Sequence, residues 1–198
     1  MDTSSYHVAE NQPFHRFSDK IKTESPGIVL SRVEEIIAFC RKAGYKKIGI
    51  ALCIRFGEHG YQLSRILKRH AFKVESVCCK VGGLQKPDYG VDVAEGDSAT
   101  ICAPAGQAEI LNRAGTDLNI QMGLCVGHDI LFTKYSEAPV TVLGVKDRAT
   151  DNNPLTVLVD PKWRTHFQMS ARADRISRNR DESKENYLHM MISERSGG

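Results

Sequence analysis

Short apolar runs alternate with helix-like segments through the middle of this chain, and this alternation constrains the fold more than any other feature. The runs are rich in Ile and Val and have the length of strands, whereas the segments between them carry apolar residues at helical spacing. Strands are expected over residues 46–53, 72–79, 118–125 and 140–145, and a further strand or helical turn over 155–159. Strands that alternate with helices favour an α/β fold, here a three-layer sandwich with a mainly parallel, Rossmann-like sheet of about four to five strands.

Helices are expected between these strands and before the first of them, over residues 31–44, 58–70, 104–115 and 127–135. The first helix has the clearest ends, because Ser31 and Glu34 match a capping box and Gly44 suits the left-handed residue that ends a helix. Cys40 continues the apolar stripe of that helix, so we expect it in the core.

The α/β domain is expected to span residues 28–165, between two polar ends. We interpret residues 1–27 as a flexible N-terminal arm and residues 166–198 as a charged, weakly structured or helical tail. The net charge of +3 gives no reason to expect a nucleic-acid partner. No apolar run reaches the roughly 20 residues of a membrane helix, and the first residues lack the pattern of a secretory signal. We therefore expect a cytoplasmic protein without a membrane partner.

Cysteine is the residue type that carries most of the chemical information here. Five of the six cysteines lie where a strand ends or just before a helix begins, and these are Cys53, Cys78, Cys79, Cys102 and Cys125. In a parallel sheet the carboxyl ends of all strands meet at one edge, and ligands bind in the crevice outside that edge. We expect these five thiols at that edge, with His128 beside them.

The first hypothesis is a site that binds zinc or an iron–sulfur cluster, with a redox or sulfur-related role. Thiolates are soft ligands that suit both, and nearby helix N-termini would stabilise the negative charge of such a cluster. The expected ligands are Cys53, Cys79, Cys102 and Cys125, with Cys78 and His128 in reserve. No C-x-x-C pair is present, so the spacing is not that of a zinc finger or a ferredoxin.

Two alternatives stay open. A metal-free enzyme would use Cys102 or Cys125 as the nucleophile, His128 as the base and Asp129 to orient the imidazole. In a small-molecule-binding module the cysteines would be core residues, and Lys146 and Arg148 would hold a small anionic ligand. The candidates for a catalytic role are therefore His128, Asp129, Lys146, Asp147 and Arg148.

The connection over residues 80–103 is longer than is usual between a strand and a helix in an α/β domain. It carries several glycines and acidic residues and lies at the edge where the thiols are expected. Both a lid over the site and a flexible insertion are consistent with this composition.

Two stretches carry a resemblance to a known family: C-x-P-x-x-Q-A-x-x-L-N over residues 102–112 and G-L-C-x-G-H-D over residues 123–129. With their flanking segments, they resemble an uncharacterised prokaryotic family commonly labelled "metal-binding protein". The resemblance covers roughly residues 28–160. It implies metal binding by the edge residues, namely Cys53, Cys78 or Cys79, Cys102 and Cys125, with His128 and Asp129 beside them. Members of that family often begin with a cluster of closely spaced cysteines, which the first 39 residues here lack, so a metal would have to sit in the α/β body.

Overall fold

The computed structural model describes residues 4–24 and 27–167. By its internal contacts the chain divides into two units, residues 1–152 and residues 153–198, which are described separately.

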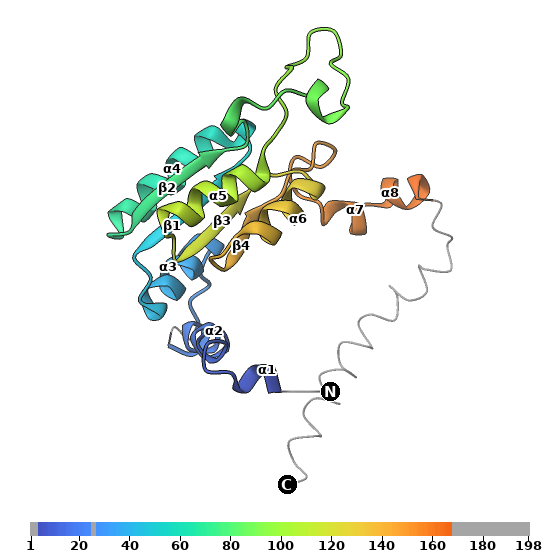
Figure 1. The fold of residues 1–198 in the computed structure, drawn as a ribbon. Helices are drawn as coiled ribbons and strands as arrows, with labels where there is room; N and C mark the ends of the chain where they lie inside the picture. The colour runs from blue at the N-terminus through green and yellow to red at the C-terminus, as the bar shows by residue number, and fades with distance from the viewer. Residues whose placement is uncertain (1–3, 25–26, 168–198) are drawn as a thin grey trace. The chain divides into compact units, whose positions relative to one another are not determined.

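The first unit is built on a four-stranded sheet in which all strands are parallel (Figure 1). The strands are β1 (Lys47–Leu52), β2 (Lys73–Cys78), β3 (Leu118–Met122) and β4 (Val140–Gly144). Their order in the sheet is β2-β1-β3-β4. The chain therefore moves outward in one direction from β1 to β2 and in the other from β3 to β4, which makes the gap between β1 and β3 the topological switch point.

Four helices pack against this sheet, as the apolar spacing predicts. They are α3 (Arg32–Ala43), α4 (Gly57–Arg69), α5 (Pro104–Ala114) and α6 (Val126–Tyr135). Buried residues of α3 and α4 share one core cluster with the sheet, and those of α5 and α6 share the other. The predicted α/β fold, a Rossmann-like sandwich of three layers, is confirmed.

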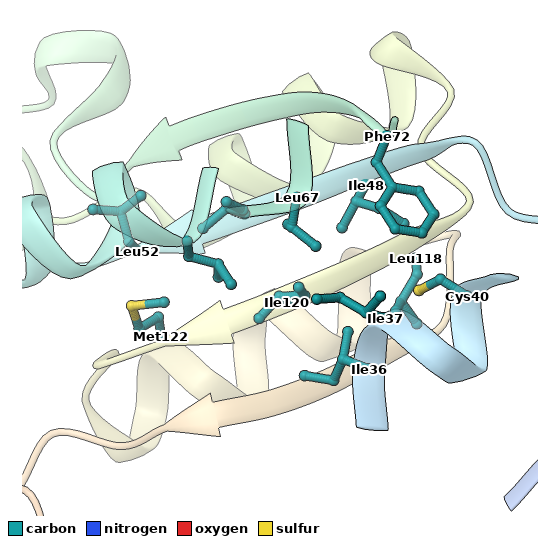
Figure 2. Packing of buried hydrophobic residues seen from close by; sticks show 12 residues of the cluster. Ile36, Ile37, Cys40, Ile48, Leu52, Leu67, Phe72, Leu118, Ile120 and Met122 are labelled. Carbon is teal, nitrogen blue, oxygen red and sulfur yellow. The ribbon is translucent and has the colours of Figure 1, made fainter. Parts of the chain in front are cut away.

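The face covered by α3 and α4, which we call the apolar face, is hydrophobic throughout its buried cluster (Figure 2). That cluster contains Ile36, Ile37, Cys40, Ile48, Ile50, Leu52, Leu63, Leu67, Phe72, Leu118, Ile120 and Met122. Cys40 is fully buried there, as its place in the helical stripe predicts. The capping box also forms: the Ser31 hydroxyl accepts from the Glu34 backbone N–H, and the Ser31 N–H donates to the Glu34 carboxylate.

The face covered by α5 and α6, which we call the thiol face, contains two buried cysteines in its cluster. The members are Ala51, Cys53, Val77, Cys79, Ala108, Leu111, Leu124 and Phe132. Because side chains alternate along a strand, Ala51 points to this face while its neighbours Ile50 and Leu52 point to the apolar face.

Two helices form at the N-terminus, α1 (Ser4–His7) and α2 (Gln12–Glu24), where the sequence predicted no regular structure. Phe14, Phe17 and Ile21 share one side of α2, and the first two rings contact Phe39 of α3 at centroid distances of 5.8 and 6.0 Å. The polar composition of residues 1–27 hides this spacing of i, i+3 and i+7, which is a helical signal.

The long connection between β2 and α5 is folded back on itself. It contains two short 3-10 turns, η2 (Val81–Gly83) and η3 (Pro87–Tyr89), and an antiparallel bridge between Gln85 and Thr100. The Lys80 ammonium also donates to the Thr100 carbonyl, which ties the two ends of the excursion together. A further short turn, η1 (Ile54–Phe56), joins β1 to α4.

The second unit contains α7 (Thr156–Val159) and α8 (Pro161–His166). The alternative of a helical turn over 155–159 is thus the one that forms. Asp160 caps α8 by accepting from the Lys162 N–H at 3.0 Å. The C-terminal tail was predicted over residues 166–198, and its residues 168–198 lie outside the part of the chain that the structure describes.

Candidate thiol site

The site lies at the carboxyl ends of the strands, at the switch point between β1 and β3. Backbone pairing continues one residue past the ends of β1 and β2, because the Cys53 N–H donates to the Met122 carbonyl at 3.1 Å and the Cys79 N–H donates to the Leu52 carbonyl at 2.9 Å. Cys53 and Cys79 are therefore fixed by the sheet itself rather than by a loop.

Cys53 contacts a lysine that comes from the far side of the switch point. Lys146 follows β4, and its Nζ lies 2.7 Å from the Cys53 Sγ. Burial acts to raise the pKa of the Cys53 thiol, but the hydrogen bond and charge of Lys146, with smaller contributions from the Arg55 backbone and Cys79, bring that pKa below its ordinary value. Lys146 thus shifts the equilibrium of the Cys53 thiol toward the thiolate.

The Lys146 ammonium interacts with two cysteine side chains. Its pKa is raised above the ordinary value, because contacts with Cys53 and then Cys125 outweigh the opposing effect of burial. Cys125, which follows β3, thus lies near Lys146 but outside the exchange pair, and the sulfur at hydrogen-bonding distance from Lys146 is that of Cys53.

Cys79 interacts with Cys53 and also with a third cysteine, Cys102. Its side chain interacts with both Cys53 and Cys102, and its Sγ accepts from the Ile54 N–H at 3.5 Å. Burial, with additional contributions from these two thiols, raises the pKa of Cys79 to about 12, so Cys79 is a neutral thiol at neutral pH. Cys53 and Cys79 belong to the same buried cluster and Cys102 packs against it, so Cys79 interacts with both of the other thiols; we call these three residues the thiol chain.

A cavity of ≈ 610 Å³ lies beside Cys102, between the 80–103 connection, α5 and α6. Cys102 and His128 both line it, together with apolar side chains such as Leu84, Ile101 and Leu131. The pKa of His128 lies below its ordinary value, chiefly because the imidazole is partly buried and also because Lys146 is near. His128 is accordingly a neutral imidazole at neutral pH.

Asp129 is held by a polar network under α6. Its carboxylate accepts a hydrogen bond from the Gln121 side-chain amide, and the Thr133 hydroxyl donates to the Gln121 carbonyl oxygen at 3.2 Å. Burial raises the pKa of Asp129 above its ordinary value, against the effect of the Gln121 bond. Asp129 is thus bonded to Gln121 of β3, a contact that fixes α6 against the sheet.

The remaining predicted site residues lie around this centre. Cys78 is half-buried at the margin of the thiol-face cluster. The Asp147 carboxylate accepts from the Ala149 and Thr150 N–H groups and so stabilises the turn after β4, and Arg148 is exposed in that turn.

Gln107 of α5 is a site residue that the sequence reasoning missed. It is fully buried, and its Nε2 donates to the Leu52 carbonyl at 3.1 Å and to the Val77 carbonyl at 2.7 Å. These carbonyls immediately precede Cys53 and Cys78, so Gln107 clamps the ends of β1 and β2 together. A signal was present, since Gln107 is a polar residue one turn before Leu111 on the buried side of α5.

Gly123 is required where β3 ends. Its φ of +65° is a left-handed conformation, and a Cβ there would lie 2.2 Å from the Phe56 ring. The close approach of Phe56 keeps η1, which follows Cys53, against the end of β3.

Metal binding finds no ready-made ligand set in this arrangement. Within residues 4–24 and 27–167, no three His, Cys, Asp or Glu side chains are grouped so that they could hold a metal ion. The predicted zinc or iron–sulfur site, and its ligands, therefore stay a prediction.

Comparison with known proteins identifies the family. A model of the family described as "Protein of unknown function (DUF1847)" matches residues 2–143. The chain belongs to this family. It is also 53% identical over 124 residues to the "Uncharacterized protein MJ0455" of Methanocaldococcus jannaschii, an alignment that covers 62% of this chain and 64% of that protein. No solved structure matches.

These comparisons confirm the resemblance to an uncharacterised family, and the metal-binding label stays a prediction. A separate finding concerns the membrane: within the described part of the chain, no helix has the length and apolar character needed to cross one.

Proposed function

We propose that this member of the family is a thiol–disulfide exchange protein whose redox pair is Cys53 and Cys79. The observation that carries the proposal is the 2.7 Å contact between the Lys146 ammonium and the Cys53 sulfur, made while the Cys79 thiol interacts with that same sulfur. A thiolate is the attacking species in such exchange, and an adjacent cation is a common way to stabilise it at neutral pH.

The reaction transfers two electrons from the cysteine pair to a disulfide RSSR. The Cys53 and Cys79 sulfur atoms become joined, the S–S bond of RSSR breaks, and two RSH molecules leave. Cys53 reacts as the thiolate, so the two protons that the RSH molecules carry come from the Cys79 thiol and from solvent. In the reverse direction Lys146 stabilises Cys53 as the leaving thiolate, and a leaving thiol of lower pKa departs faster.

A redox titration tests the proposal. The full chain is equilibrated with mixtures of 2-mercaptoethanol and its small, neutral disulfide, quenched with an alkylating agent and mapped by peptide mass spectrometry. We expect a reversible Cys53–Cys79 disulfide, lost in Cys53→Ser and Cys79→Ser and retained in Cys78→Ser, which is the matched control. Free Cys53 and Cys79 across the whole range of potentials would overturn the proposal.

A metal site is the second candidate, and the observation that favours it is the consecutive contact of three soft donors, Cys53, Cys79 and Cys102. These side chains would have to reorient to surround one ion. Protein purified without oxygen is analysed for metal content and for an iron–sulfur absorption spectrum. Stoichiometric metal that disappears in the triple Cys→Ala variant would establish the metal site and overturn the exchange function.

A further inference from the structure

We propose that Cys102 is the entry thiol of this centre and that the cavity beside it binds a small, neutral, apolar disulfide. This inference rests on the proposed function of Cys53 and Cys79. It assigns the route by which a substrate reaches them and the chemical class of that substrate.

The need for an entry thiol follows from burial. Cys53 is 3% exposed and Cys79 is 2% exposed, so a bulky disulfide has little direct access to either sulfur. Cys102 is half-buried, lines the cavity and interacts with Cys79. The Ala103 N–H donates to the Cys79 carbonyl at 2.8 Å, which holds Cys102 next to Cys79.

The cavity indicates what kind of disulfide fits. Its volume of ≈ 610 Å³ lies within the range of small-molecule sites, and Leu84, Ile101, Ile110 and Leu131 give it apolar walls. Its two charged lining residues, Glu109 and Arg113, form an ion pair with each other at 3.1 Å. The walls thus offer apolar surface and a self-compensated pair of charges, which favours a neutral ligand.

The walls are also fixed in place. The Ile101 N–H donates to the Leu84 carbonyl at 2.8 Å, and Lys86 pairs with Asp97 across the same connection. A cavity whose sides are already bonded to each other keeps its shape before a ligand arrives, so little ordering is needed on binding.

The relay has three exchanges. His128, on the same cavity wall, accepts the Cys102 proton as the Cys102 sulfur attacks RSSR; it then passes that proton to the first RS⁻, which leaves as RSH. Cys79 attacks the Cys102 sulfur while its proton moves to the Cys53 thiolate, and the second RS⁻ leaves and takes a proton from solvent. Cys53 then attacks the Cys79 sulfur and its proton moves to the departing Cys102 sulfur. The end state is a Cys53–Cys79 disulfide and a free Cys102 thiol.

The test uses a dipyridyl disulfide, which is neutral and aromatic and releases an absorbing thiopyridone. It compares this reagent with hydrogen peroxide, which is small enough to need no entry thiol. Peroxide oxidises the Cys53 thiolate to a sulfenic acid, and the Cys79 thiol then displaces water from that sulfur to form the disulfide. The background is Cys78→Ser/Cys125→Ser, which leaves four cysteines. We expect two thiopyridones per chain and a Cys53–Cys79 disulfide. Cys102→Ser should slow the dipyridyl reaction on the order of tenfold, because access limits thiol reactivity, while hydrogen peroxide still gives the Cys53–Cys79 disulfide.

The cavity is tested separately by filling it. Leu131→Trp, whose side chain lines the cavity, should also slow the dipyridyl reaction, whereas Ile130→Trp on the exposed side of α6 should not. An unchanged dipyridyl rate in both Cys102→Ser and Leu131→Trp would overturn the entry role while leaving the proposed function intact. A wild-type chain that forms no Cys53–Cys79 disulfide with either oxidant would overturn the proposed function itself.

Discussion

The two faces of the sheet surround cysteine in opposite ways. On the apolar face Cys40 is fully buried, and burial, with a smaller effect of the Asp117 charge, raises the pKa of Cys40 to about 12. On the thiol face Cys53 is almost as buried, yet its pKa lies below the ordinary value because Lys146 donates to its sulfur. Burial alone therefore does not decide whether a cysteine is inert; a cation within hydrogen-bonding distance does.

The faces also differ in how their cores are held. The buried polar side chains of the described chain are Gln107, Asn119 and Gln121, and all belong to the thiol face. Asn119, for example, accepts from the Thr116 hydroxyl and donates to the Ser136 hydroxyl, both at 2.8 Å. Because such bonds are directional, this face fixes positions of side chains, whereas the apolar face contributes mainly buried area.

The largest expected effect is a loss of stability on the apolar face that leaves the reaction of the thiol face unchanged. Leu67 is fully buried on the apolar face, so Leu67→Ala should lower the free energy of unfolding by about 2–5 kcal/mol through lost contacts and a residual cavity. Urea unfolding measures this change. Under native conditions, formation of the Cys53–Cys79 disulfide should keep its wild-type rate, and a slower rate would mean that the two faces are coupled.

Gln107→Leu, on the thiol face, should lower the stability moderately and also slow the formation of the Cys53–Cys79 disulfide. The substitution keeps the side-chain volume but removes the donor to the Leu52 and Val77 carbonyls, which costs about 1–3 kcal/mol. We expect slower Cys53–Cys79 disulfide formation because the end of β1 loses its clamp. Gln62→Leu, on the exposed side of α4, is the matched control and should leave the rate unchanged.

Lys146→Met should raise the pKa of Cys53 and so make this cysteine behave more like Cys40. Since the wild-type pKa is lowered, the rate of Cys53 alkylation should reach half its maximum at a lower pH in wild type than in the variant. At a pH below both midpoints the variant should react about tenfold more slowly for each unit of difference. Alkylation by iodoacetamide across a pH series, with peptide mapping, measures this.

Two internal references support that experiment. Cys40 should stay unlabelled in both proteins, and Lys146→Arg should keep a low midpoint because a cation remains. Superimposable profiles for wild type and Lys146→Met would show that Lys146 does not activate Cys53.

The fold was largely predictable because its signals are local. The apolar runs at β1 to β4 and the capping box at Ser31 identify each element from a few adjacent residues. Helix α2 is the exception, because the polar composition of residues 1–27 hides the helical spacing of Phe14, Phe17 and Ile21; in the structure the first two rings contact Phe39 of α3.

The site was predictable only as a region. Strand ends place the five cysteines near one edge, but which of them touch depends on side-chain direction and sheet order. Cys53 and Lys146 are 93 residues apart, and β3 lies between their strands, so no local pattern reports their contact. The sequence places Lys146 among the residues that could hold an anionic ligand, and in the structure its ammonium donates to the sulfur of Cys53.

The smallest expected effect concerns helix caps, which also differ between the faces. Helix α3 begins with the Ser31 capping box, whereas α6 begins at Cys125 without a side-chain cap, although Cys125 has the extended backbone (φ −77°, ψ 159°) that a capping residue adopts. Serine is a preferred N-cap, so Cys125→Ser should stabilise the fold by about 0.5–1 kcal/mol, seen as a Tm shift of roughly 2–4 °C per kcal/mol.

Ser31→Ala is the matched control, because it removes a cap instead of adding one. It should lower the free energy of unfolding by about 1 kcal/mol. Cys125 contacts Lys146 but lies outside the Cys53–Cys79–Cys102 chain, so Cys125→Ser should leave disulfide formation intact. A loss of stability in Cys125→Ser would mean that the contact between this sulfur and Lys146 contributes more to the fold than a cap does. The thiol face would then depend on its sulfur atoms for structure as well as for chemistry.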